Sequence, residues 1–168
     1  MLLGGHARPA ALLHGGSHER GFRAGTLPVP LIVGFGVACA LALEARARDA
    51  AHTQALRDRL WARLQAGARG LLLNGALEPR LPANLNLSIE GIDVARLLLE
   101  LRGFALSSGS ACRSLAGGPS HVLLALGRSP ALAKASLRFG LGRHTTEAEV
   151  DAAADALIEA LGRLRSKA

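Results

Sequence analysis

The sequence predicts an α/β chain of the α+β kind, in which helices pack on a short, largely antiparallel sheet. Two kinds of stretch support this prediction: long runs with apolar residues at helical spacing, and short runs in which apolar and polar residues alternate. The chain has 168 residues, about one domain, and 49% of them are hydrophobic, so it can bury a sizeable core. Aromatic residues make up only 3%. The core is therefore expected to be aliphatic.

The chain is expected to begin with an irregular arm that leads into a long helix. Residues 1–30 are rich in glycine and proline, which break regular structure. From 31 to about 68 the sequence is rich in Ala, Leu, Arg and Glu, and three leucines follow one another at four-residue spacing: Leu56, Leu60 and Leu64. These leucines stack on one helical face, which is expected to face the core.

The beginning of this helix is strongly apolar. No charged residue occurs from Gly25 to Leu43, a stretch close to the length of a membrane span. Pro28 and Pro30 interrupt it, and the strictly apolar part is Leu31 to Leu43. The sequence therefore favours a buried helix over a membrane span. Cys39, within this run, is expected to be a small core residue.

Four short segments have the composition of strands. Alternation of apolar and polar residues is clear over 85–89 and 137–141 and predicts half-buried strands there. The segments 71–74 and 104–107 are expected to be two further short strands. Because alternate residues face opposite sides of a sheet, the polar residues of the half-buried strands should share one face.

The remaining helices carry recognisable start signals. Asp93 can cap the helix that follows it. Pro119 occupies a favourable first helical position for a run over 119–126. Thr146 and Glu149 form a capping box before the last helix, whose apolar stripe should face the core.

The charge balance is basic but does not indicate a nucleic-acid-binding protein. Lys and Arg number 20 against 13 Asp and Glu, which gives a net charge of +7. The basic residues are scattered, and with one Trp and no Tyr the chain offers few platforms on which bases could stack. A nucleic-acid partner is therefore not expected, and neither is a membrane.

The cysteine and histidine patterns exclude two kinds of site. Cys39 and Cys112 are too far apart and too few for a disulfide framework or a zinc site. His14 and His18 are separated by two glycines, which disfavour the helix that would place both rings on one metal. The N-terminal sequence does not have the pattern of a secretory signal. We expect a cytoplasmic protein with no resident metal.

Three residues are candidates for chemistry. Cys112 lies in a run of small polar residues over 107–114, next to Arg113, where a thiol can be exposed and stabilised as thiolate; an unreactive loop cysteine fits the composition equally well. Arg138 lies on the polar face of its strand and could clamp a carboxylate, although an ordinary surface arginine is the simpler interpretation. Thr26, after a glycine, has a hydroxyl that could hold phosphate.

Taken together, these segments resemble a known family. The stretch from His14 to Val29 is similar to a motif of the cysteine desulfurases, NifS- and IscS-like enzymes of the class-V aminotransferase family. Later segments match in the same order: 73–75, 84–86, 107–112, 122–127 and 137–143. The chain is thus similar, over nearly its whole length, to the C-terminal half of the long-loop type of desulfurase.

The resemblance implies a fold, a reaction and three site residues. The fold is the small C-terminal domain of fold-type I enzymes, which use pyridoxal 5'-phosphate, and the reaction converts L-cysteine to L-alanine. Cys112 would take the sulfur as a persulfide, Arg138 would bind the substrate carboxylate, and Thr26 would reach the cofactor phosphate of the other subunit in a homodimer. Scaffold or carrier proteins would then receive the sulfur for iron–sulfur cluster or thiocofactor assembly, with Cys112 at most a transient cluster ligand.

One element of the family pattern is missing. The lysine that carries the cofactor lies in a His-Lys motif that nothing here matches, because Lys134 and Lys167 occupy other positions. We therefore interpret 31–168 as the small domain with its cysteine loop (107–118), and 1–30 as an interface arm left from the large cofactor domain. Such a fragment is expected to be inactive alone. A non-enzymatic sulfur-relay or assembly module, or an inactive remnant, is the alternative.

Overall fold

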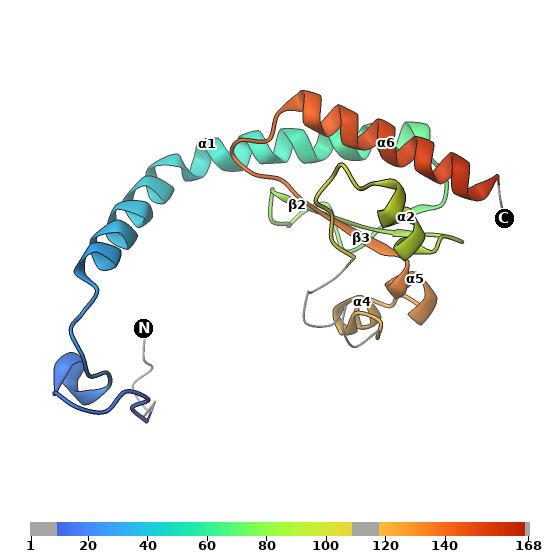
Figure 1. Cartoon of the computed structure of the whole chain (residues 1–168). Coiled ribbons are helices and arrows are strands. Elements are labelled where there is room, and N and C mark those ends of the chain that lie inside the picture. The colour runs from blue at the N-terminus through green and yellow to red at the C-terminus, as the bar shows by residue number, and fades with distance from the viewer. Residues whose placement is uncertain (1–9, 109–117, 167–168) are drawn as a thin grey trace. The chain divides into compact units, whose positions relative to one another are not determined.

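The structure is a computed structural model and describes residues 10–108 and 118–166 (Figure 1). It divides into two compact units, one up to Ala45 and one from Arg46 onward. The helices and strands, in chain order, are η1 (His18–Gly21), α1 (Val29–Gly67), β1 (Leu71–Leu73), β2 (Asn84–Ile89), α2 (Val94–Glu100), α4 (His121–Ala125), α5 (Pro130–Lys134), β3 (Ser136–Gly140) and α6 (Glu147–Arg165).

The first unit contains the arm and the beginning of α1. As predicted, the described part of the arm is mostly irregular, with the single short helix η1. Within η1, Glu19 and Arg20 have φ of 52° and 57°, the left-handed region that only glycine adopts without cost. Ala24 is buried, and its backbone N–H donates to the carbonyl of Leu13 at 3.2 Å. This hydrogen bond joins the segments that precede and follow η1.

The apolar beginning of α1 is exposed, and the prediction of a buried helix is wrong for this segment. Leu31 and Phe35 are each 73% exposed, and Cys39 is an exposed free thiol rather than a core residue. Among the described residues, α1 is the one helix that is long and apolar enough to span a membrane by length and composition. Its charge-free part, 29–43, extends roughly 22 Å as a helix, less than the roughly 30 Å of a bilayer core. The composition of this segment favours burial against another surface, but it does not identify that surface.

We expect the chain on its own to self-associate through the segment 29–43, because exposed apolar area of this kind is removed from water by association. Replacing Leu31 and Phe35 together by Asp should lower the average mass measured by light scattering toward that of a monomer. Leu99→Asp is the matched control, since this leucine is 60% exposed on α2. An association that persists unchanged in the double variant would show that another surface causes it.

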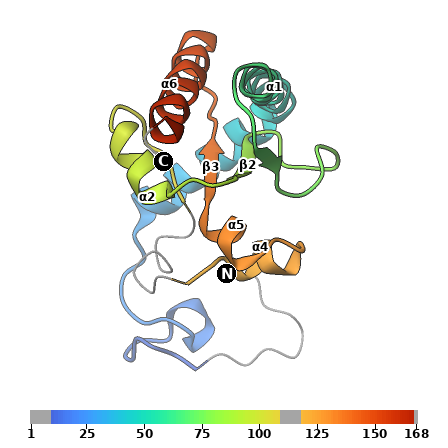
Figure 2. The ribbon, with the colours of Figure 1, turned by 90° about the vertical axis from the view of Figure 1, so that its right-hand side faces the viewer.

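The second unit is built on a three-stranded antiparallel sheet in the order β1-β2-β3, which confirms the predicted fold class. One face of the sheet carries Leu85, Leu87, Leu137 and Phe139, all buried. They pack with leucines of α1 and α6 in the aliphatic core. Figure 2 shows α1 and α6 on one side of the strands and α4 and α5 on the other. The polar face of the sheet thus lies toward α4 and α5.

Two local predictions are wrong and two are confirmed. The segment 104–107 is not a strand, and only Ser107 pairs, in an isolated bridge with β3. Pro119 precedes α4 instead of opening it, because the hydroxyl of Ser120 takes the N-cap position and accepts from a backbone N–H. Asp93 caps α2 as predicted, and both bonds of the predicted capping box are present at the start of α6.

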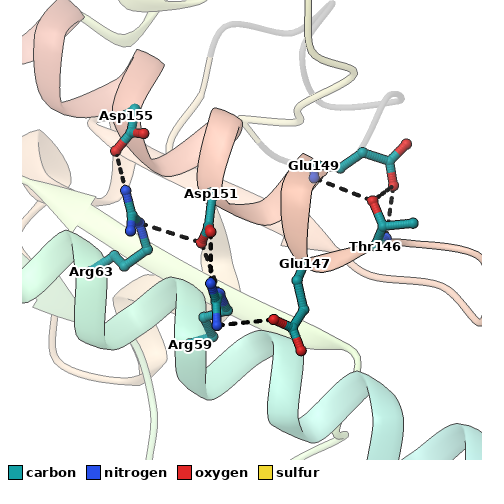
Figure 3. A network of polar contacts seen from close by, with 7 residues as sticks. All are labelled: Arg59, Arg63, Thr146, Glu147, Glu149, Asp151 and Asp155. Carbon is teal, nitrogen blue, oxygen red and sulfur yellow. Dashed lines mark hydrogen bonds and ion pairs between the residues drawn. The ribbon is translucent and has the colours of Figure 1, made fainter.

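Helices α1 and α6 are also joined by a network of ion pairs (Figure 3). Arg59 donates to the Asp151 carboxylate through Nε at 2.8 Å and through Nη2 at 2.7 Å. Arg63 reaches Asp155 at 2.5 Å, and Arg59 also pairs with Glu147 at 3.0 Å. The hydrogen bond from Arg59 is the largest cause that lowers the pKa of the Asp151 carboxyl. The network joins the first half of α6 to the part of α1 around Arg59 and Arg63.

The lowered pKa of Asp151 predicts an acid-sensitive contribution to stability. A carboxyl whose pKa is lower in the folded chain stabilises the fold above its unfolded pKa, near 3.8, and loses this contribution as pH falls through the folded pKa. Chemical denaturation at a series of pH values should show a free energy of unfolding that falls below about pH 4. In Asp151→Asn this fall should be shallower, whereas Glu159→Gln, on the same helix, should keep it. Equal slopes in Asp151→Asn and the parent chain would contradict the assignment.

Candidate active site

A pocket of about 730 Å³ lies on the polar face of the sheet. We call it the β3 pocket. Its walls come from β2 and β3, from α2, and from the segment that includes α4 and α5. The polar and charged lining residues include Asn74, Arg80, Asn84, Asn86, Asp93, Ser108, His121, Lys134 and Arg138, and Gly118 lines it as well. The alternation of residues in β2 and β3 explains the location, since every second side chain faces away from the aliphatic core.

Arg138 lies in the β3 pocket with its backbone held on both sides. On one side it lies opposite Asn86 of the neighbouring strand β2. On the other side its backbone N–H donates to the carbonyl of Ser107 at 2.7 Å. Ser107 returns a bond from its N–H to the Arg138 carbonyl at 3.4 Å. The guanidinium is exposed and has no hydrogen-bond acceptor within residues 10–108 and 118–166. A side chain with a fixed backbone and a free fork of donors can bind a planar anion.

Cys112 lies outside the described residues, but both described neighbours of its segment are at the β3 pocket. Ser108 lines the pocket on one side of the undescribed residues, and Gly118 lines it on the other. The two described residues that flank the segment 109–117 therefore both lie at the pocket that contains Arg138. The resemblance implied that Cys112 and Arg138 act on one substrate, but the bridge between Ser107 and Arg138 was not predicted from the sequence.

Thr26 lies in the first unit and Arg138 in the second, so the two candidates are described separately. The Thr26 side chain is exposed, and its hydroxyl makes no hydrogen bond in the described part of the chain. Gly25, before it, has φ +90°, and Arg23 Nη1 donates to the carbonyls of Gly25 and Thr26 at 3.0 and 3.2 Å. These bonds fix the backbone and leave the threonine hydroxyl free for an acceptor.

A network of polar side chains holds the β2 side of the β3 pocket in place. It was not predicted from the sequence. Asn74, 3% exposed, donates through Nδ2 to Asn86 Oδ1 at 2.7 Å. Arg128 Nε donates to Asn74 Oδ1 at 2.7 Å, and its Nη2 donates to the carbonyl of Leu73 at 2.5 Å. The only signal in the sequence was the polar position of Asn86 in an alternating strand.

The charges around the pocket suit an anionic ligand. Among the described residues, its basic lining residues are Arg80, His121, Lys134 and Arg138, against the single acid Asp93. Desolvation lowers the pKa of Arg80, which still leaves a cation at neutral pH. Among the described residues, no group of three or more His, Cys, Asp or Glu is arranged to hold a metal ion. The pocket is therefore best matched by a carboxylate or another small anion.

The family model for aminotransferase class-V matches residues 1–153. The chain belongs to the class-V aminotransferase family. The chain is 47% identical over 158 residues to the cysteine desulfurase IscS of Aeromonas salmonicida, a match that covers 94% of this chain and 39% of the relative. This class-V chain thus spans about two fifths of the length of that relative, and its predicted similarity to cysteine desulfurases is confirmed.

Solved structures agree with the class-V assignment and with the predicted fold. A NifS-like protein superposes with a TM-score of 0.75 at 34% identity, over 90% of this chain and 38% of its own. SspA in complex with cysteine superposes with a TM-score of 0.55 at 29% identity, over 84% of this chain and 38% of its own. The helices and the three-stranded sheet are therefore a portion of that larger fold.

The family implies pyridoxal phosphate, and the described residues of this class-V chain do not form a site for it by themselves. Lys134, which lines the β3 pocket, is exposed on α5 and lies outside any motif of the family's cofactor lysine. Among the described residues, the pocket's one acid is Asp93, whose Oδ1 caps α2 by accepting the N–H of Ala95 at 2.9 Å and whose Oδ2 lies 3.8 Å from Arg96. What the described residues offer is a set of hydrogen-bond donors that can bind an anion.

Proposed function

We propose that this chain is the sulfur-accepting portion of a cysteine desulfurase, which converts L-cysteine to L-alanine and leaves the sulfur on Cys112 as a persulfide. The similarity to IscS enzymes over 94% of the chain supports this activity. The β3 pocket supports it independently, because it combines a free guanidinium with both ends of the segment that contains the cysteine.

The bridge between Ser107 and Arg138 is the observation that carries the proposal. It fixes the start of the cysteine segment to the backbone of the arginine that would bind the substrate. Cys112 is four residues beyond Ser108, so covalent geometry alone keeps its Cα within about 14 Å of Ser108. A nucleophile on a tether of this length can approach a ligand held by Arg138.

The proposed step balances without an added oxidant or reductant. The thiolate of Cys112 attacks the sulfur of L-cysteine, so that one S–S bond forms and the Cβ–S bond breaks. The electron pair of the broken bond stays on Cβ, which takes up a proton and becomes the methyl group of alanine. Sulfur is oxidised and carbon is reduced. Arg138 would hold the substrate carboxylate through two parallel N–H···O bonds while this occurs.

The cofactor and the sulfur acceptors are the remaining components of the activity. Pyridoxal phosphate, when bound, supplies the electron sink that makes the Cβ–S bond of cysteine breakable. We propose that it is held by the part of the desulfurase that this chain does not match, and that the hydroxyl of Thr26 contributes to its phosphate in a homodimer. We also propose that scaffold or carrier proteins accept the sulfur from Cys112 and that the enzyme is cytoplasmic.

The proposal is tested by reconstitution. This chain is joined to the portion of the Aeromonas salmonicida enzyme that it does not match, and the product is called the reconstituted enzyme below. With pyridoxal phosphate and L-cysteine, the reconstituted enzyme should form alanine, whereas the chain alone should form none. A reconstituted enzyme that binds the cofactor but forms no alanine would contradict the proposal. Persulfide that reaches Cys112 only from a separate desulfurase would instead support a relay module.

A further inference from the structure

Asn86 lies directly beside Arg138 in the β3 pocket. The two residues are paired across β2 and β3, and directly paired residues of antiparallel strands share one face of the sheet. Both line the pocket. Asn86 is half-buried, whereas the guanidinium of Arg138 is exposed. A small ligand held by the arginine would therefore lie against the asparagine as well.

The direction of the Asn86 amide is fixed by the groups beneath it. Arginine can only donate hydrogen bonds, so the atom of Asn74 that receives Arg128 Nε at 2.7 Å must be its oxygen, Oδ1. Asn74 then turns its Nδ2 toward Asn86, and the Asn86 atom at 2.7 Å must accept. That atom is Oδ1, which leaves Nδ2 of Asn86 on the other side of the amide. This assignment follows from the chain of partners and not from a distinction between N and O atoms.

The Nδ2 group of Asn86 donates to no protein atom within residues 10–108 and 118–166. It belongs to a residue that lines the pocket, next to the guanidinium of Arg138, which also has no side-chain hydrogen bond within the described residues. Two sets of N–H donors therefore face the same space, one charged and one neutral, and a carboxylate has two oxygens that can accept from both.

We propose that Asn86 binds the substrate carboxylate together with Arg138, and that Asn74 and Arg128 are positioning residues that hold its amide in the donating orientation. The proposal rests on the proposed function, since it takes an amino acid as the ligand of this pocket. It adds a second contact for the carboxylate. It also gives a role to the buried Asn74 and to the half-buried Arg128 that holds it.

The direct test is an NMR titration of the isotope-labelled chain with L-alanine, the product, which has the same carboxylate as the substrate but no thiol. Alanine should shift the Asn86 side-chain NH₂ signal, whereas ethylamine, which has no carboxylate, should not. Asn86→Ala should weaken alanine binding about tenfold, the effect of one hydrogen bond to a charged group. Gln65→Ala is the matched control, because Gln65 is an exposed side-chain amide on α1 that does not line the β3 pocket. It should bind alanine as the parent chain does.

The positioning role has a sharper test in Asn74→Asp. The new carboxylate keeps an acceptor for Arg128 but can no longer donate to Asn86, so the Asn86 amide should turn and donate downward. Its oxygen would then face the ligand. Alanine binding should fall at least as far as in Asn86→Ala, while the Asn86 NH₂ signal should become protected from solvent exchange. A purely structural role for Asn74 would not protect that signal.

The outcomes separate this inference from the proposed function. If Arg138→Ala abolishes alanine binding and Asn86→Ala leaves it unchanged, the second contact is wrong and the carboxylate site at Arg138 stands. If neither variant changes binding, or if alanine causes no carboxylate-dependent shift in the pocket of the parent chain, both are wrong. Tenfold weaker binding in Asn86→Ala, with Gln65→Ala unchanged, supports both.

Discussion

Cys112→Ser should reduce alanine formation by the reconstituted enzyme to the level of a control without enzyme. A serine hydroxyl is neutral at physiological pH and far less nucleophilic toward sulfur than a thiolate, so the Cβ–S bond of the substrate has no attacking group. The measurement is alanine formed per enzyme over time, with cofactor absorbance recorded to show that the variant still binds pyridoxal phosphate.

The matched control is Cys39→Ser, the chain's other cysteine. Its thiol is exposed in the first unit, on the apolar part of α1, and has no part in the β3 pocket. The rate of alanine formation in this variant should equal that of the parent. If Cys39→Ser lost activity and Cys112→Ser kept it, the assignment of the nucleophile would be wrong.

Arg138→Ala should lower kcat/KM for L-cysteine about a hundredfold in the reconstituted enzyme. Two charge-assisted hydrogen bonds are removed, each worth about tenfold or more in binding. Arg138→Lys keeps the charge but not the planar fork, and should fall between the parent and the alanine variant. The comparison needs initial rates over a range of cysteine concentrations, so that KM and kcat are separated.

The control for Arg138 is Arg96→Ala on α2. Arg96 also carries a positive charge, but its side chain is 78% exposed and pairs only weakly with Asp93, at 3.8 Å. It does not line the β3 pocket. If both alanine variants lost activity equally, a general loss of positive charge would explain the result and the specific site would not.

The local pattern of the sequence predicted the frame of this site. Alternation in β2 and β3 placed Arg138 on a polar face, and the resemblance to desulfurases named its role before the structure was known. The capping signals at Asp93 and Thr146 located two helix starts. Each of these signals acts within a few residues of the chain, which is why the sequence alone was sufficient.

Contacts between distant parts of the chain could not be predicted in this way. Arg128 reaches Asn74 across 54 positions, and Arg59 reaches Asp151 across 92. Nothing local marks these partners, because they depend on how the strands and helices are arranged. The segment 104–107 shows the converse case: its composition suits a strand, but only Ser107 finds a backbone to pair with.

The exposed segment of α1 illustrates a third limit. Hydrophobic composition predicted a buried helix over 31–43, but burial depends on a neighbouring surface, which the described residues do not supply. The chain spans 39% of the length of its Aeromonas relative, so the proposed covering surface is the part of the desulfurase that it does not match. The same reasoning assigns the cofactor to that part.

Sulfur-34-labelled L-cysteine offers the most direct test of the link between Arg138 and Cys112. After a single turnover of the reconstituted enzyme, alkylation and peptide mass spectrometry locate the labelled sulfur. We predict one labelled sulfur atom on the Cys112 peptide, none on the Cys39 peptide, and strongly reduced labelling in Arg138→Ala. Alanine formed with no label on Cys112, or with the label on Cys39, would contradict the account.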